Sequence, residues 1–154
     1  MNLGYHEAGQ PEQLGSMDPW SGYMNSRRRL LAHIDTQCRG NVMTVSGDTH
    51  RHYGGDLIQD HGNGKIISSE YLATSISSGA DGVGEDDDYT RSLHAENPNL
   101  KALTDRRGYV LCDVGRYLWR GDLKVLDTIA TRNGTLSTHA SFVTERGKPG
   151  LQRA

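Results

Sequence analysis

The chain has 154 residues, a formal net charge of -2 and 34% hydrophobic residues. This slightly acidic balance disfavours a protein built to bind nucleic acid or an anionic membrane, because such proteins carry a basic surface. No apolar stretch approaches the roughly 18 residues of a membrane-spanning helix, and two cysteines cannot make a disulfide framework.

The first 17 residues contain glycine and proline but few apolar side chains, so we expect a loop or a truncated end. They hold no apolar segment of the kind found in signal peptides, and none is predicted. No internal repeat divides the remainder, and residues 18–154 are expected to form one domain.

A helix is the first predicted element. Asp18 and Pro19 are typical of a helix start, with Asp as the cap and Pro at the first helical position. Apolar side chains then recur at spacings of three and four up to Cys38, and Gly40 is typical of a helix end. The sequence therefore predicts an amphipathic helix over about residues 19–38.

Two strands are predicted next. Residues 41–46 have no helical period and are expected to form a buried strand that ends at Gly47. A second strand is expected over about residues 70–77, ending in the glycine-rich turn 78–84. A helix that leads into such strands is typical of a layered fold with both helices and sheets.

The last part of the chain is rich in strand-forming residues. After a polar, weakly helical segment that ends near Leu103, strands are expected within 109–114, 117–129 and 138–145. Asn133 followed by glycine is a strong hairpin signal, so consecutive strands here are expected to be antiparallel. The predicted class is α+β, with a long helix, a mixed sheet and late antiparallel strands.

The segment from Gly47 to Tyr53 carries the residues best suited to chemistry. Asp48 and His50 offer a carboxylate oxygen and an imidazole nitrogen just after a strand, where layered folds collect ligand-binding side chains. This pair suits a metal ion that handles phosphate oxygens. His52 is a candidate third ligand, proton donor or supporting group, and Arg51 is a candidate phosphate ligand.

Other interpretations remain open. Asp48 is also a common turn residue, and the histidines are also compatible with a polar surface. The segment 75–84 is compatible with a phosphate cradle or with a plain surface loop. The acidic run 85–88 lacks the ligand spacing of a calcium loop and is expected to be solvated. Whether Cys38 and Cys112 pair is not decided by the sequence.

Several motifs occur in one order along the chain. They are Ser-Met-Asp-x-Trp-x-Gly-Tyr at 16–23, Arg-Arg-Arg-Leu-Leu at 27–31, Gly-Asp-x-His at 47–50, Thr-Ser-Ile-Ser-Ser-Gly-x-Asp-Gly at 74–82, Glu-Asn-Pro at 96–98, Arg-Gly-Tyr-Val at 107–110, Ala-Ser-Phe-Val-x-Glu at 140–145 and Pro-Gly-Leu at 149–151. This order resembles the PhoD-like alkaline phosphatases (alkaline phosphatase D) over about residues 14–151.

The resemblance implies a metal-dependent hydrolase, a secreted or periplasmic phosphomonoesterase or phosphodiesterase. Its implied fold is a calcineurin-like metallophosphatase core of two packed mixed sheets flanked by helices, with an iron and calcium centre between them. With the residue chemistry above, the expected site has metal ligands Asp48 and His50, catalytic residues His50 and His52, and substrate-binding residues Arg51, Asn97 and Arg107.

The resemblance covers only the C-terminal part of the family's metallophosphatase domain. The chain is therefore expected to hydrolyse a small-molecule phosphoester only as one piece of that domain. Its expected partner is the missing N-terminal half, and no binding to nucleic acid or to a membrane is expected. The alternative is a non-catalytic fragment or interaction remnant. In both cases we expect an open sheet that is incompletely covered.

Overall fold

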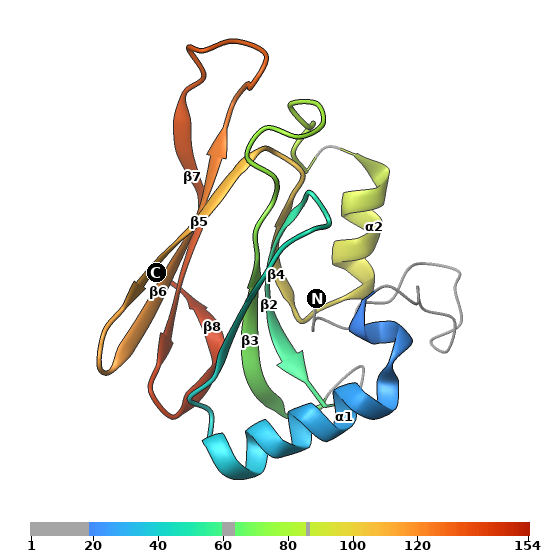
Figure 1. Cartoon of the computed structure of the whole chain (residues 1–154), viewed down its shortest axis with the longest axis vertical. Coiled ribbons are helices and arrows are strands. Elements are labelled where there is room, and N and C mark those ends of the chain that lie inside the picture. Colours follow the sequence, from blue (N-terminus) through green and yellow to red (C-terminus); the bar gives the residue numbers. More distant parts are fainter. Residues whose placement is uncertain (1–18, 60–63, 86) are drawn as a thin grey trace.

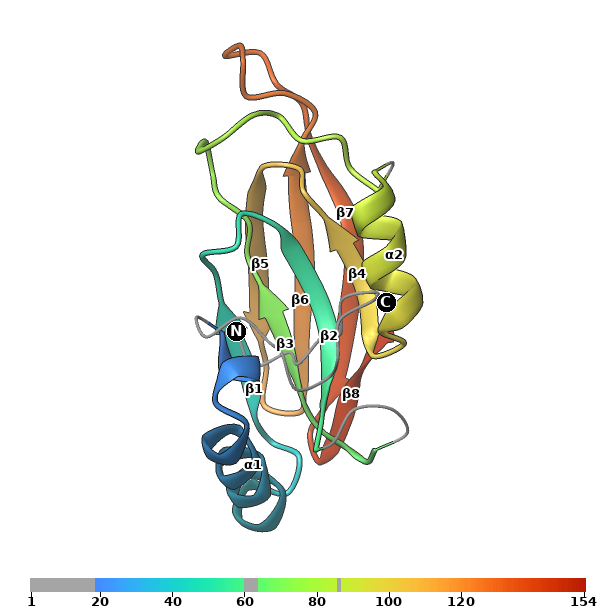
Figure 2. The ribbon, with the colours of Figure 1, turned by 90° about the vertical axis from the view of Figure 1, so that its right-hand side faces the viewer.

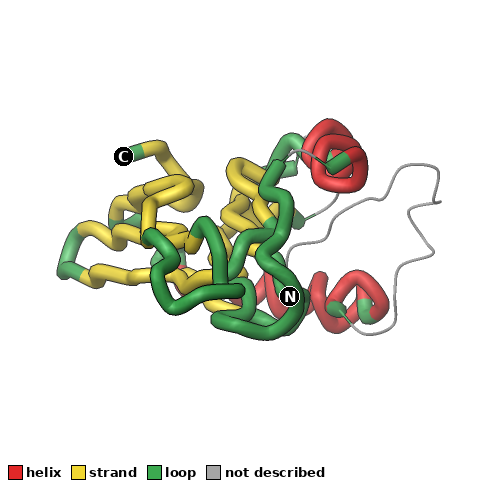
Figure 3. Tube along the Cα trace, turned by 90° about the horizontal axis from the view of Figure 1, so that it is seen from above, coloured by secondary structure: helices red, strands yellow, loops and turns green. Residues whose placement is uncertain are grey.

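The computed structural model describes residues 19–59, 64–85 and 87–154. Two four-stranded sheets pack against each other, and two helices lie on the outer side of the first sheet (Figures 1 and 2). Seen from above, the strands form the body of the molecule and both helices lie to one side of it (Figure 3). Helices, one mixed sheet and one antiparallel sheet are the elements expected of the α+β class.

The predicted N-terminal helix is present over nearly the expected range, but it is not continuous. A 3₁₀ turn (Trp20–Gly22) precedes α1 (Met24–His33), and a π-helical turn (Ile34–Cys38) follows it. Asp18 lies outside the described residues, and Pro19 is extended, before the first turn rather than within it. The helix ends at Arg39 and Gly40, which both have positive φ, as the glycine predicted.

Arg27 fixes α1 against the first sheet from a buried position. Its side chain is only 1% exposed, and its guanidinium donates hydrogen bonds to the carbonyl oxygens of Ile58 (3.0 Å) and Gln59 (3.2 Å). These carbonyls end the strand on which the helix packs. A charged donor at this place therefore satisfies backbone groups that the helix would otherwise cover.

Replacing Arg27 by Met should lower the free energy of unfolding by about 2 kcal/mol, because hydrogen bonds from a charged donor are lost while most of the packing volume is kept. Urea denaturation of parent and variant measures this. The exposed neighbour substitution Arg28→Met is the matched control and should change stability by less than about 0.5 kcal/mol. Equal effects of the two substitutions would contradict the role of Arg27.

The first sheet is mixed, in the order β1-β3-β2-β4. Its strands are β1 (Met43–Ser46), β2 (His52–Ile58), β3 (Ile66–Leu72) and β4 (Leu100–Thr104). β1 runs parallel to β3, and the other pairs are antiparallel. The prediction of a buried first strand is wrong, because β1 lies at the sheet edge and its Val45 is 53% exposed. The second predicted strand begins and ends earlier than expected, since β3 stops at Leu72.

The second sheet is an antiparallel meander in sequence order. Its strands are β5 (Gly108–Val114), β6 (Leu118–Leu126), β7 (Leu136–Glu145) and β8 (Lys148–Arg153). The late antiparallel strands and the connection around Asn133 are therefore confirmed. β8 was not predicted, because Pro149 and Gly150 within it are poor strand formers.

Two apolar clusters hold the layers together. On the helix side of the first sheet, α1 and α2 (Asp88–Glu96) share one cluster of buried side chains with the strands. Its leucines and isoleucines are Leu31, Ile34, Leu57, Ile67, Leu72, Leu93, Leu100 and Leu103. Between the sheets lie Tyr71, Ala102, Leu123, Ala140, Phe142 and Leu151. Gly121 of β6 admits the Tyr71 ring, since a Cβ there would lie 2.3 Å from a ring carbon.

One side of the two-sheet body is open. β1 and β5 are both edge strands, and Met43 of β1 and Val110 of β5 pack on the same cluster between the sheets. Apolar side chains of both strands are largely exposed, among them Val45 (53%), Leu111 (49%) and Val114 (60%). The expected incompletely covered sheet is thus present.

None of the described helices is long and apolar enough to cross a membrane.

Candidate functional site

Four loops lie at one end of the molecule, uppermost in Figure 1: 47–51, 73–85, 105–107 and 127–135. Hydrogen bonds join the last three: the Asp105 carboxylate accepts from the Gly84 N–H (2.7 Å), and the Asp81 carboxylate accepts from Thr128 Oγ1 (2.7 Å) and the Ile129 N–H (2.6 Å). The Ile129 N–H is the main cause of the lowered pKa of Asp81. The glycine-rich segment 75–84 is therefore tied to its neighbours on both sides.

Asp48 and His50 lie on the first of these loops, directly after β1. Both side chains are exposed, and both residues have positive φ, 84° and 55°. For residues other than glycine this backbone conformation costs of order 1–3 kcal/mol and persists only where the surroundings impose it. Such strain is concentrated at ligand sites, so the loop is the best candidate site in the structure.

Glu70 holds the strand that leads into this loop. The Ala73 N–H donates to the Ser46 carbonyl (2.8 Å), which continues the β1–β3 pairing past its last register position. Ser46 Oγ donates to the carboxylate of Glu70, a fully buried side chain of β3. The position of Asp48, two residues later, is therefore set by a buried polar contact that the sequence pattern did not indicate.

His52 lies in the interior, in contrast to the exposed Asp48 and His50. Its Nδ1 accepts from the Thr74 N–H (3.4 Å), so the proton resides on Nε2, which donates to the Lys124 carbonyl (3.1 Å). Burial is the largest cause that lowers the pKa of His52 from 6.5 to about 4. The ring is thus neutral at pH 7 and links the first sheet to β6 of the second.

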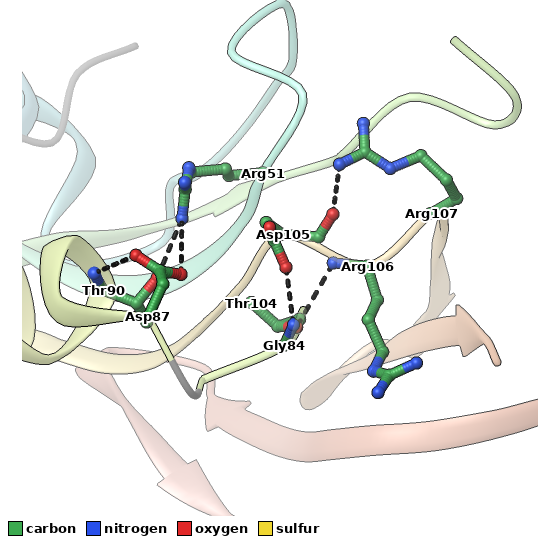
Figure 4. A network of polar contacts seen from close by, with 8 residues as sticks. All are labelled: Arg51, Gly84, Asp87, Thr90, Thr104, Asp105, Arg106 and Arg107. Carbon is green, nitrogen blue, oxygen red and sulfur yellow. Dashed lines mark hydrogen bonds and ion pairs between the residues drawn. The ribbon is translucent and has the colours of Figure 1, made fainter. Parts of the chain in front are cut away.

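Arg51 is bound to the beginning of α2 (Figure 4). Its Nη1 donates to Thr90 Oγ1 (2.8 Å) and lies 3.6 Å from a carboxylate oxygen of Asp87. The guanidinium carbon stands 4.9 Å from the centre of the Tyr89 ring. This predicted phosphate ligand therefore already has three protein partners.

The other two predicted substrate-binding residues are buried and separate from each other. Asn97 follows the last turn of α2 and donates to the Leu93 carbonyl (2.7 Å), so α2 lies between it and Arg51. Arg107 lies among the four loops and donates to Ser75 Oγ (2.8 Å) and to the Ser78 carbonyl (3.0 Å). The structure brings Arg51 and Arg107 to the same end of the molecule, and it places Asn97 elsewhere.

The acidic run is divided among separate contacts in the structure. Asp87 caps α2 by accepting from the Thr90 N–H (2.8 Å), and Glu85 lies 3.1 Å from His139 Nε2. Over the described ranges, no three or more His, Cys, Asp and Glu side chains gather closely enough to hold a metal ion. By donor type the Asp48 carboxylate fits iron or calcium and the His50 imidazole fits iron, but the two residues supply only two ligands of the four or more that such ions take.

A groove of about 320 Å³ lies away from this site. Residues 40–43 and the β5–β6 connection line it, so it adjoins the beginning of β1, whereas Asp48 follows the end of β1. The groove and the candidate loop are therefore separate features. The loop remains the candidate site, because Asp48 and His50 are donors of the kind that metal ions take and both have positive φ.

Comparisons with known proteins show the family of the chain. The family model of the PhoD-like phosphatases matches residues 1–123. The chain belongs to the PhoD-like phosphatase family. It is 34% identical over 140 residues to alkaline phosphatase D of Bacillus subtilis (strain 168), an alignment that covers 90% of this chain and 24% of that protein. It also superposes on the solved structure of PhoD with a TM-score of 0.86 and 30% identity, over 100% of this chain and 30% of that one.

The chain therefore spans about a quarter of the length of the PhoD-like relative that it matches. The Gly-Asp-x-His motif lies in an exposed loop with positive φ, and within the described residues no further metal donors converge on it. The sequence indicated the loop, but it did not indicate Asp87, Thr90 or Glu70. The only signal for these was Asp87 at the start of a weakly helical segment.

Proposed function

We propose that this chain is the C-terminal part of a metal-dependent phosphatase domain, and that it contributes Asp48 and His50 to the metal centre for hydrolysis of a phosphomonoester or diester. The observation that carries the proposal is the loop after β1, where two exposed donor residues both adopt positive φ. Membership in the PhoD-like family supports the reaction class. The calcineurin-like layering and an iron and calcium centre belong to the same proposal.

The chain's own residues have distinct roles in this proposal. The Asp48 carboxylate and the His50 imidazole act as metal ligands, and when bound the metal ions supply Lewis-acid polarisation of the phosphate and a hydroxide nucleophile. His50, which is exposed, is also the candidate to hold a proton near the leaving oxygen. For His52, buried and neutral, the proposed role is to hold the first residue of β2 beneath the loop.

The proposed partner is the remaining part of a PhoD-like domain. The open edges of β1 and β5 support it, because unpaired strands with exposed apolar side chains accept further strands. The second candidate function is a non-catalytic fragment or interaction remnant. The presence of only two candidate donors on the described loop favours that alternative for this chain alone.

Metal uptake tests the proposal directly. The purified chain is titrated with Ca²⁺ and, separately, with iron, and the double substitution Asp48→Ala, His50→Ala should weaken binding about tenfold or more. Its melting temperature should fall only slightly, because both side chains are exposed while alanine tolerates the positive φ of these positions less well. Asp113→Ala removes another exposed carboxylate, on β5, and should leave metal binding unchanged. Equal metal binding by parent and double variant would sink the metal assignment.

Turnover separates the two candidate functions. The chain is assayed with a phosphomonoester and a phosphodiester, alone and co-expressed with the upstream part of Bacillus subtilis alkaline phosphatase D. The enzymatic proposal expects turnover in the co-expressed sample, and loss of that turnover in the double variant. If no sample turns over either substrate, with or without added metal, the result would favour the interaction remnant.

A further inference from the structure

Arg51 has an arrangement that a free phosphate ligand would not need. Its side chain is 24% exposed, and one guanidinium nitrogen serves both Thr90 Oγ1 (2.8 Å) and the Asp87 carboxylate (3.6 Å). The guanidinium carbon lies over the Tyr89 ring, 4.9 Å from its centre. A hydrogen bond, an ion pair and a cation–π contact together fix both the position and the plane of the group.

The partners of Arg51 are themselves held. Asp87 accepts from the Thr90 N–H (2.8 Å) and from Thr90 Oγ1 (2.6 Å), which closes the first turn of α2. Leu93, one turn later, is 2% exposed and packs in the cluster between α2 and the first sheet. The contact surface that Arg51 meets is therefore a capped helix end, anchored by the buried Thr90 and, one turn later, by Leu93.

The loop that Arg51 ends needs such support. Asp48 and His50 keep a positive φ only if both flanks of the loop are fixed. The Ser46 contact with Glu70 fixes the flank before the loop, and the His52 contacts fix β2 after it. Arg51 lies between His50 and His52 and connects this stretch sideways to α2.

We propose that Arg51 is a positioning residue, which holds the Asp48–His50 loop in its metal-binding conformation by clamping it to the beginning of α2. The inference rests on the proposed metal role of Asp48 and His50. It assigns to Asp87, Thr90 and Tyr89 a shared task that neither the sequence pattern nor the family membership gives them.

Backbone order in the loop is the deciding measurement. With ¹⁵N relaxation of the whole chain, the amides of Asp48, Thr49 and His50 should have order parameters near ~0.85 in the parent, and Arg51→Ala should lower them below ~0.6. Arg51→Lys keeps the charge opposite Asp87 and should restore most of the order. Asp87→Asn keeps the helix cap but removes the charge, and it should loosen the same three amides.

A matched control guards against a general effect of losing an arginine. Arg91→Ala removes an arginine of α2 that pairs with the exposed Asp88, and the loop order should remain that of the parent. Loop order unchanged in both Arg51→Ala and Asp87→Asn overturns the proposal. Equal loosening by Arg91→Ala also overturns it, because the clamp would then not be specific. If Arg51→Ala fails to fold, Asp87→Asn decides alone.

A titration with Mn²⁺ alone separates this inference from the proposed function. Paramagnetic broadening at His50 reports binding, and Arg51→Ala should raise the apparent dissociation constant about fivefold to tenfold, with partial recovery in Arg51→Lys. If the parent does not bind Mn²⁺, the metal assignment fails while the loop-order result still decides the clamp. If the parent and Arg51→Ala bind Mn²⁺ equally although the loop of the variant is loosened, the positioning role is overturned.

Discussion

Replacing Phe142 by Ala is expected to lower the free energy of unfolding by about 3–5 kcal/mol. Phe142 is 1% exposed and lies between the two sheets with Tyr71, Leu123 and Leu151. Its ring also faces the backbone of β2, because a Cβ on Gly54 would lie 3.4 Å from it. Removal of the ring therefore opens a cavity where both sheets meet.

Urea denaturation of parent and Phe142→Ala measures this effect. Leu136→Ala on the same strand is the matched control, since Leu136 is 48% exposed and should contribute less than about 0.5 kcal/mol. A similar loss for both substitutions would show that the two sheets do not pack as described. Phe142→Leu, which keeps much of the volume, should recover roughly half of the loss.

Stability should fall as the pH is lowered from 6.5 to about 4, because His52 is buried in its neutral form. The unfolded chain binds a proton at the ordinary pKa of 6.5, whereas burial lowers the folded pKa to about 4. Above pH 6.5 the ring is neutral in both states, and below pH 4 it is protonated in both. The stability lost between these values is about 3 kcal/mol, from 1.36 kcal/mol per pKa unit.

The comparison of parent with His52→Gln isolates this contribution. Free energies of unfolding are measured between pH 8 and 4, and the variant should show a shallower decline over the window from 6.5 to 4. Burial also lowers the pKa of His139. Because His139 is present in both proteins, its contribution to the pH dependence of stability cancels in the comparison. Identical slopes for parent and His52→Gln would contradict the buried neutral ring.

The sequence predicted those elements whose signals are local. The late strands alternate in character and are separated by turn residues, so β5, β6 and β7 were predicted close to their observed bounds. β2 was missed because its seven residues are all buried, which removes the alternation, and because it contains two glycines and Asp56. The buried Asp56 carboxylate is stabilised by partners from other strands, which are Ser69 Oγ (3.0 Å), Lys101 Nζ (2.8 Å) and the Leu151 N–H (2.8 Å).

In the candidate site, too, the sequence indicated the residues with a local pattern and missed those that only packing brings together. A strand followed by Gly-Asp-x-His was enough to indicate Asp48 and His50, since a polar cluster after a strand is a local pattern. The partners of Arg51 lie more than thirty-five positions away in the sequence. No periodicity connects such residues, and only the packing of α2 against the first sheet brings them together.

The order of strands has a consequence for how the chain folds. Every pairing in the second sheet joins strands that are neighbours in sequence, so each requires closure of only a short loop. In the first sheet, β1 must pair with β3 across the intervening β2, which is a less local contact. Because contacts between distant residues form more slowly, we expect the meander to fold first and to serve as the template on which the first sheet is assembled.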